Sequence, residues 1–472
     1  MAALLIFLPL IFLIVLNLPF PTLRRFAFRF AVIAALYQIL WVVFYSSVFR
    51  HMPQDLLISM NLKVDNLSLV LLLTIGIVMP VAALVARSSI NDPVRRFDFF
   101  NLSLIALIGM NGTVITSDIF SLYVFMEVTA ISMFILISLE KGKLALEGAF
   151  KYLILSAIAT VLILTSIALI IFVAGDTSFA SVLSAVENSG SSPFLKLAVI
   201  LFICGLFIKS GVVPFHGWLP DAYAAAPTAV SVFLAGIVTK VTGVYVLIRL
   251  VVSVFGLVPA TQNIIMFIGA ISIIIGAFAA LGQSDFKRML AYSSISQVGY
   301  MILALGCGTG LALAGAIFHL FNHAIFKSLL FVNAAAVEKQ LGTVNMNKMG
   351  GLSARMPVTG ATSVFGLLST AGIPPFSGFW SKVIIIIALW NSARYGYAVL
   401  ALLASIVTLA YFLSMQRRVF FGKIKDGLEN INEVEFGLLA PQLILAFITI
   451  GVGILFPIIL NSFILPAASI LR

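Results

Sequence analysis

Long apolar runs separated by short polar stretches extend along the whole chain. A helix needs about 20 mostly apolar residues to cross roughly 30 Å of hydrocarbon, and fourteen segments reach about that length. Their apolar positions follow a helical period, and no ten-residue alternating segments indicate a barrel. The predicted spans are residues 1–18, 28–49, 64–87, 99–117, 119–140, 147–174, 195–220, 227–252, 263–282, 287–306, 312–338, 357–388, 396–416 and 436–465. The pattern predicts an all-α polytopic membrane protein.

Composition supports this prediction and restricts the kinds of site that the chain can contain. The 472 residues are 62% hydrophobic and 10% charged, with a mean hydropathy of +1.17, outside the range of ordinary soluble domains. The longest polar connections, near residues 176–193, 339–356 and 417–435, have about 20 residues each. Cys204 and Cys307 are far apart and form no C-x-x-C motif. We therefore expect no cofactor, no metal, and no redox or hydrolytic site of the chain's own.

The net charge of +11 follows the predicted topology and gives no reason to expect nucleic-acid binding. Eighteen lysines and arginines fall in or beside the odd-numbered loops, whereas six fall on the opposite side, namely Arg50, Lys63, Lys196, Arg249, Arg394 and Arg472. Cytoplasmic loops of membrane proteins carry an excess of basic residues. The odd-numbered loops are thus predicted to be cytoplasmic, in a multi-pass protein of the cell (inner or cytoplasmic) membrane with both termini outside.

A weak internal repeat divides the chain. Asp118 and Gly148 recur with their neighbours as Asp285 and Gly315, both 167 positions later. The repeat unit spans five predicted helices, and an odd number makes the two copies inverted, which is typical of transporters. The predicted units are residues 1–98 with spans 1 to 3, residues 99–252 and 263–416 as the two repeats, and residues 417–472 with a cytoplasmic loop and the last span.

Two predicted spans combine a proline break with a lysine. Pro214 follows Lys209 in span 7, and Pro374-Pro375 precedes Lys382 in span 12. Proline removes a helix hydrogen bond, so free carbonyls and water can solvate a buried ammonium near the break. The alternative is a kinked structural helix whose lysine extends to the interface, which is easier for Lys382 because it lies nearer the outer end.

Two further spans carry polar residues near their centres. Lys240 lies among small and hydroxyl residues that permit close helix packing. His319, His323 and Lys327 occur at i, i+4 and i+8, so they share one helix face. A histidine pair at this spacing can be half of a zinc site, but no carboxylate or cysteine partner is evident. Structural hydrogen bonding and a proton relay remain the two main interpretations, and the relay is favoured.

Glu127 is the only carboxylate predicted at mid-membrane. A lysine at a helix centre costs roughly 2.5–3.5 kcal/mol, so the four lysines together cost on the order of 10–14 kcal/mol when unpaired. An ion pair between Glu127 and Lys209 keeps both groups charged, and breaking the pair allows the lysine to release its proton. The sequence therefore indicates a proton path with a switch.

Residues 209–221, 319–327 and 372–382 resemble the antiporter-like membrane subunits of respiratory complex I, Mrp-type sodium/proton antiporters and membrane-bound hydrogenases or related ferredoxin-linked complexes. The resemblance covers nearly the whole chain. It implies about fourteen helices, with two inverted half-channels joined by a hydrophilic axis. It also implies proton transfer by seven residues, with Glu127 and Lys209 as a switching pair. The seven are Glu127, Lys209, Lys240, His319, His323, Lys327 and Lys382. Lysine at position 382 is similar to the distal complex I subunit and to the Mrp D-type subunit.

The leading hypothesis is a proton-translocating subunit of a larger energy-converting membrane complex. Its partners are other membrane subunits, protons and the lipid bilayer, with sodium crossing, if at all, in a partner. The second hypothesis is a subunit of a secondary Mrp-type sodium/proton antiporter. An organic solute carrier and a structural scaffold are less favoured, because the polar residues are spread over several helices and form no single pocket.

Overall fold

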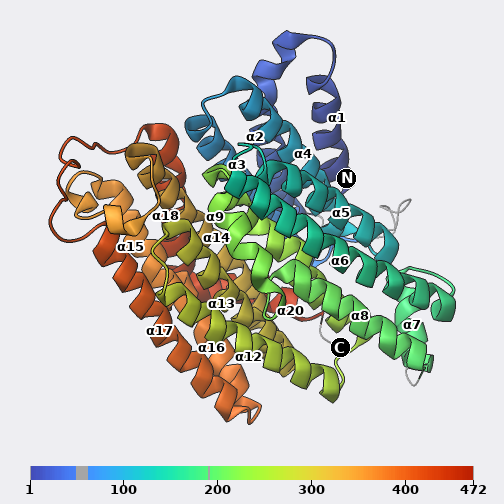
Figure 1. The fold of residues 1–472 in the computed structure, drawn as a ribbon. Helices are drawn as coiled ribbons and strands as arrows, with labels where there is room; N and C mark the ends of the chain where they lie inside the picture. The colour runs from blue at the N-terminus through green and yellow to red at the C-terminus, as the bar shows by residue number, and fades with distance from the viewer. Residues whose placement is uncertain (1, 49–61, 190–191, 471–472) are drawn as a thin grey trace.

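The computed structural model describes residues 2–48, 62–189 and 192–470, which form one bundle of helices packed side by side (Figure 1). Arg50 and Arg472, two of the basic residues predicted for the outer side, lie outside the described residues. Helices suit a membrane interior because each satisfies its own backbone hydrogen bonds.

The first half of the described chain contains α1 (Leu4–Leu16), α2 (Ala27–Val48), α3 (Asn66–Ser89), α4 (Pro93–Ile115), α5 (Ile119–Ile137), α6 (Lys143–Ala174), α7 (Phe179–Ser189), α8 (Pro193–Ser210), α9 (Leu219–Ala225), α10 (Thr228–Phe233) and α11 (Val246–Leu250). The second half contains α12 (Pro259–Leu281), α13 (Phe286–Cys307), α14 (Gly310–Leu341), α15 (Pro357–Ala371), α16 (Ser377–Asn391), α17 (Tyr395–Val419), α18 (Phe436–Ile454), α19 (Phe456–Ile459) and α20 (Leu465–Ala468). Wider π-helical turns, η5 (Leu234–Val238), η6 (Lys240–Tyr245) and η7 (Val251–Phe255), make α10 and α11 parts of one continuous segment, Thr228–Phe255.

Twelve helical segments of the described chain are long and apolar enough to cross a membrane, and each coincides with a predicted span. The other two predictions, residues 1–18 and 357–388, correspond to shorter helices. The first is α1 with 13 residues, and the second is divided into α15 and α16 with 15 residues each. The all-α polytopic fold is confirmed, whereas the count of fourteen spans is not.

Two segments form the centre of the bundle. In both Thr228–Phe255 and α14, every residue of the most apolar 18-residue window is buried, whereas only 28% of the corresponding α6 window is buried. Polar side chains on these two central segments have no direct route to solvent, so other protein groups must solvate them.

Glycines end the two broken helices. The cap of α8 is Gly211 with φ of 66°, and the cap of α15 is Gly372 with φ of 84°. Glycine adopts this left-handed conformation without a steric penalty. Each proline follows three residues later, at Pro214 and Pro375, so proline continues a break that glycine begins. The division into repeats at residues 99–252 and 263–416 stays a prediction.

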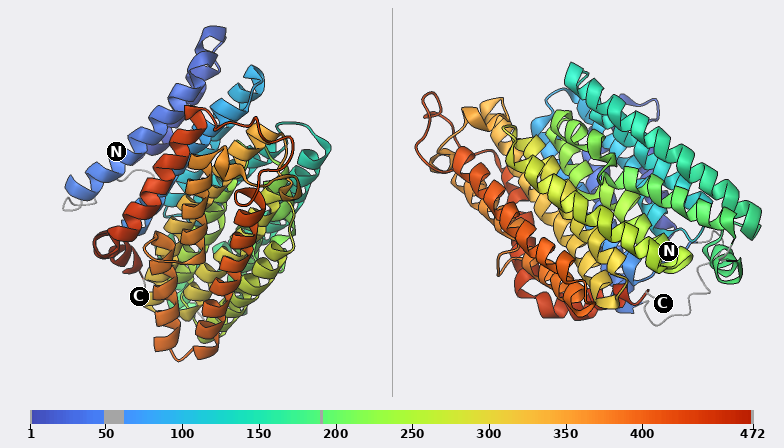
Figure 2. Two further views of the ribbon diagram at one scale, coloured as in Figure 1. Left: turned by 90° about the vertical axis from the view of Figure 1, so that its left-hand side faces the viewer. Right: turned by 60° about the horizontal axis from the view of Figure 1, so that its bottom comes forward.

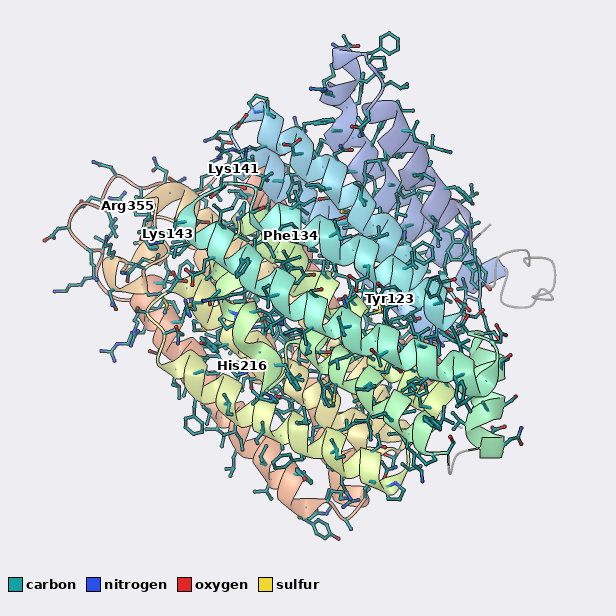
Figure 3. The ribbon with its side chains drawn as sticks, turned by 45° about the vertical axis from the view of Figure 1, so that its right-hand side comes forward. Tyr123, Phe134, Lys141, Lys143, His216 and Arg355 are labelled. Atoms are coloured by element: carbon teal, nitrogen blue, oxygen red, sulfur yellow. The ribbon has the colours of Figure 1, made fainter. Side chains whose placement is uncertain are left out.

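Basic residues of two helix connections lie at one end of the bundle. Figure 3 shows Lys141, Lys143 and Arg355 together at that end, and Tyr123 lies toward the other. Lys141 lies between α5 and α6, Lys143 is the first residue of α6, and Arg355 lies between α14 and α15. These two connections, which are predicted to share one side of the membrane, therefore lie at the same end of the molecule.

Candidate functional site

An ion pair joins α5 and α8 at the break after α8. Lys209 Nζ donates to Glu127 Oε1 at 2.8 Å, and Thr160 of α6 donates to the same oxygen at 2.8 Å. Lys209 Nζ also lies 3.4 Å from Ser156 Oγ. The lysine side chain is 5% exposed and the glutamate side chain 21%. The structure thus brings the predicted pair together and supports it with two hydroxyl groups from α6.

The carbonyl at the end of α8 does not solvate Lys209, although the proline break predicted this role. Ile208 O accepts from Trp218 Nε1 at 3.0 Å and from the amide of Gly211 at 3.1 Å. The break therefore satisfies this carbonyl itself, and Lys209 is held by a carboxylate and a hydroxyl group instead of by carbonyls.

Lys240 lies in the wholly buried segment beside α8. Its side chain is fully buried, and Nζ donates to the carbonyl of Ala235, five residues earlier, within the π-helical turns. Two glycines bring its neighbours close: a Cβ on Gly236 would overlap Ser328 Oγ of α14, and one on Gly243 would lie 2.7 Å from the Cα of Ser210. Because both positions are glycine, this segment packs directly against α14 and against the end of α8. The close packing expected around Lys240 is present.

A small cavity separates Lys209 from the Lys240 segment. Its volume is about 10 Å³, near the lower limit for one water molecule. Polar lining is provided by Lys209, Ser156, Thr239 and Thr242. Ser156 of α6 and Thr239, the residue before Lys240, therefore form a short polar link between the ion pair and the Lys240 segment.

The histidines of α14 differ in their partners. His319 Nδ1 lies 2.9 Å from Ser381 Oγ of α16. Neither ring nitrogen of His323 has a hydrogen-bond partner among the described residues, although the side chain is fully buried. The two ring centroids are 6.3 Å apart. Structural hydrogen bonding therefore accounts for one ring nitrogen of His319, whose Nε2 has no partner among the described residues, and for neither nitrogen of His323.

Lys327 is also fully buried on α14 and faces α13. Its Nζ donates to Ser293 Oγ, lies 3.1 Å from Leu290 O, and lies 5.5 Å from the ring centre of Phe412. A hydroxyl, a carbonyl and an aromatic face together solvate the ammonium without a counter-charge.

Lys382 of α16 turns back toward the break between α15 and α16. Its Nζ donates to Thr370 O at 2.8 Å and lies 4.7 Å from the ring centre of Tyr300. The residue is 2% exposed, so it does not extend to the interface as the alternative interpretation required. The carbonyls at the C-terminal end of α15 carry partial negative charge, and they supply at Lys382 the solvation that was expected at Lys209.

The site residues form one series through the centre of the bundle. His323 lies within electrostatic reach of Lys240, Lys327 and Lys382, and Lys327 within reach of the other two lysines. Within the described chain, Lys209 is the only lysine of the series with a carboxylate partner. Ammonium, imidazole and hydroxyl groups all exchange protons, so these side chains have the chemistry that a proton path requires.

Sequence reasoning missed the hydroxyl partners of these residues. Ser156 and Thr160 face Glu127 and Lys209, and Ser293 faces Lys327. Serine and threonine are common in membrane helices, so their occurrence alone identifies no site. The i, i+4 spacing of Ser156 and Thr160 was the one available signal.

A second buried ion pair was also missed. Arg249, assigned from sequence to the outer loops, is 8% exposed and donates from Nη2 to Asp65 Oδ1 at 2.7 Å. Asp65 precedes α3 and caps it through the amide of Ser68. Burial opposes ionisation of this carboxyl, but Arg249 and Ser68 outweigh burial and hold its pKa at about 2. The pair joins segments 184 residues apart in the chain.

Asp221, which follows the break after α8, also has two basic partners. Its carboxylate lies 2.6 Å from Lys151 Nζ of α6 and 2.8 Å from Arg288 Nη2 of α13. Asp221 therefore connects α9 to one helix in each predicted repeat. In the parts of the chain that the structure describes, no three histidine, cysteine or acidic side chains group together to hold a metal ion.

A multi-pass helical bundle with broken helices and a buried lysine series defines an antiporter-like membrane subunit. The family described as NADH:quinone oxidoreductase/Mrp antiporter, transmembrane, matches residues 116–408. The chain belongs to this family. The resemblance inferred from the sequence motifs is therefore confirmed.

Individual relatives agree with this assignment. The D-type subunit of the Na(+)/H(+) antiporter of Alkalihalophilus pseudofirmus is 33% identical over 393 residues, which cover 83% of this chain and 80% of the relative. The N-type subunit of the NADH-quinone oxidoreductase of Desulforudis audaxviator is 33% identical over 68% of this chain and 64% of the relative. By their names, both relatives are subunits of larger proteins.

Solved structures share the fold. A chain of the membrane-bound sulfane sulfur reductase, an archaeal respiratory membrane complex, has a TM-score of 0.88 at 30% identity, covering 100% of this chain and 97% of the other. A chain of the Mrp complex from Dietzia has a TM-score of 0.91 over the same shares, and its 22% identity supports the fold alone.

Proposed function

We propose that the chain is a proton-translocating, antiporter-like subunit of a multisubunit energy-converting membrane complex, of the complex I type or the ferredoxin-linked type. The observation that carries this proposal is the ion pair of Lys209 and Glu127 at one end of a series of buried basic residues. Family membership supports the class of protein, and the series supports protons as the transported ion.

The proposed route runs from Lys209 to Lys240 and then to Lys327 and Lys382. His319 and His323 of α14 carry protons between Lys240, Lys327 and Lys382. Glu127 acts as the switch. While its carboxylate lies 2.8 Å from Lys209, the ammonium is stabilised. When the pair opens, the uncompensated ammonium releases its proton toward Lys240 through the small polar cavity. Breaking a buried ion pair costs about 3–5 kcal/mol, so the opening requires energy from outside the subunit.

That energy comes from partner subunits. Moving one proton against 100 mV costs about 2.3 kcal/mol, and no described cluster of side chains in this chain could bind a metal for redox chemistry. The partners are thus other membrane subunits of a hetero-oligomeric complex in the cell (inner or cytoplasmic) membrane. The basic end of the bundle in Figure 3 supports an orientation with that end in the cytoplasm and both termini outside.

The test uses the complete complex, reconstituted in vesicles and driven by its own electron donor. Lys209→Ala and Glu127→Ala are expected to abolish proton pumping while assembly persists. Lys196→Ala is the matched control, because Lys196 lies on the same helix but is exposed. Normal pumping by both site variants contradicts the proposal.

The second candidate is a subunit of a secondary Mrp-type sodium/proton antiporter, and the name of the relative from Alkalihalophilus pseudofirmus favours it. Sodium prefers clustered oxygen ligands, whereas the described series contains basic side chains with a single carboxylate. Protons are therefore the proposed ion in this chain, and any sodium crosses in a partner. Transport that requires a reduced electron donor favours the first candidate, and transport driven by an ion gradient alone favours the second.

A further inference from the structure

Five arginines line a cleft at the edge of the bundle. None of them belongs to the lysine series. The cleft has a volume of about 720 Å³ and lies between the turn joining α1 to α2, the end of α3 and the start of α4. The left view of Figure 2 shows the α1–α2 pair at the margin of the molecule. The arginines that line it are Arg24, Arg25, Arg29, Arg87 and Arg96.

The positive charge in this cleft is not balanced by the described protein. Asp98 is the one acidic residue in the lining, and none of the five arginines forms an ion pair with a described acidic side chain. The nearby Asp92 caps the amide of Val94 and pairs with Arg95 instead. Several like charges that share one cleft attract an anion strongly.

Four of the five guanidinium groups lie over aromatic rings. Arg24 lies 5.2 Å from the ring centre of Phe97, and Arg87 lies 4.7 Å from that of Phe28. Arg25 and Arg29 each lie 5.3 Å from the ring centre of a third phenylalanine. Stacking leaves the edge N–H groups of arginine available, and these match phosphate oxygens in pairs.

An apolar stripe continues from the cleft along the outer face of α2. Ile33, Leu36 and Leu40 follow Arg29 at positions +4, +7 and +11, so all four share one helix face. Their exposures are 48%, 48% and 57%. At 1.5 Å per residue the stripe is about 16 Å long, comparable to much of an acyl chain. Exposed apolar residues also border the cleft itself, with Val94 65% exposed.

We propose that this cleft binds the phosphate headgroup of an anionic phospholipid whose acyl chains lie along the exposed stripe of α2. A soluble anion makes no use of an apolar stripe, and an acidic protein segment matches the arginines but not the stripe. A phospholipid matches both, and basic pockets at the ends of membrane helices suit such headgroups.

The test measures lipid binding to the purified chain by native mass spectrometry. Phosphatidylglycerol is expected to bind more tightly than phosphatidylcholine. Each basic side chain near an anionic headgroup contributes roughly five-fold, so Arg29→Gln combined with Arg87→Gln weakens phosphatidylglycerol binding by about 25-fold. The control pair is Lys141→Gln with Arg355→Gln, which removes the same charge from the same end of the bundle and leaves the affinity unchanged.

Three outcomes overturn the proposal. The first is equal weakening by the control pair, which indicates a general charge effect. The second is equally tight binding of soluble glycerophosphoglycerol, which indicates a site for free phosphate compounds. The third is cross-linking of the cleft in the intact complex to an acidic segment of a partner subunit, with no phosphatidylglycerol bound. If the double variant fails to fold, Arg87→Gln alone is expected to weaken binding about five-fold.

Discussion

Replacing Glu127 by glutamine removes the charge of the proposed switch and little else. Glutamine has nearly the same shape and keeps an oxygen that accepts from Thr160 and Lys209, which now lie 2.8 Å from Glu127 Oε1. The helices α5, α6 and α8 are therefore expected to stay packed as they are. What is lost is the electrostatic stabilisation of the Lys209 ammonium.

The size of that loss follows from the geometry. Two unit charges 2.8 Å apart interact with about 6 kcal/mol at an effective dielectric constant of about 20. Partial exposure of Glu127 and the cost of desolvation reduce this interaction energy. We therefore use about 3 kcal/mol, the lower end of the cost of removing one partner from a buried ion pair. Since 1.36 kcal/mol corresponds to a factor of ten, proton pumping is expected to fall by about 100-fold.

The assay is the initial rate of vesicle acidification by the reconstituted complex, divided by the rate of electron transfer in the same sample. Glu429→Gln is the matched control, because Glu429 lies exposed in the loop before α18. Assembly is checked by gel filtration. A Glu127→Gln complex that assembles and pumps within two-fold of the control refutes the assignment of Glu127 as the switch.

Three further predictions concern other parts of the molecule. Lys382→Met removes the side chain that donates to Thr370 O, and proton flux is expected to fall by roughly 100-fold. Asp65→Asn leaves Arg249 buried without a carboxylate and lowers the free energy of unfolding by about 3 kcal/mol. Because the pKa of Asp65 is about 2, below its unfolded value near 3.9, its contribution of about 3 kcal/mol is complete above about pH 5 and is lost as pH falls through about 2. Gly378→Ala places a Cβ against Ser369 O, inside van der Waals contact, and destabilises the start of α16 by about 1–3 kcal/mol.

Each of these has its own measurement and control. The Lys382 variant is compared with Lys196→Met in the vesicle assay, and equal flux contradicts a role for Lys382. Thermal unfolding between pH 2 and pH 7 tests Asp65, and the prediction is wrong if the wild type and the asparagine variant lose stability in parallel. Gly396→Ala controls for Gly378→Ala, because a Cβ on Gly396 meets nothing within 4 Å. Equal melting temperatures for the two alanine variants contradict the packing argument.

The positions of most membrane helices could be predicted because the bilayer imposes their length and composition. The lysines and Glu127 stood out for the same reason, since a charge in an apolar run is energetically unusual. Lys209 and Glu127 could be paired because only one acid was available at mid-membrane. The break at Pro374-Pro375 was predicted within one span, but its division into two helices of 15 residues was not, because both halves are apolar and the average hydropathy stays high.

Other features depend on tertiary structure. The π-helical turns around Lys240 have no periodic signature in the sequence, and they become understandable only from the close approach of Gly236 and Gly243 to α14 and α8. Arg249 looked like a loop charge because it lies near the end of a span, and its partner Asp65 is too distant in sequence to suggest a pairing. The break in span 7 was likewise attributed to Pro214, whereas Gly211 is the residue that ends α8.

The most direct test of the proton route is the flux through Lys240→Met in the reconstituted complex. Lys240 is fully buried between the ion pair and α14, so a proton that follows the series has to pass it. Methionine fills similar space without a titratable group. The account predicts a flux at least about 100-fold below that of Lys196→Met while the complex remains assembled. Flux equal to that of Lys196→Met shows that protons take another path.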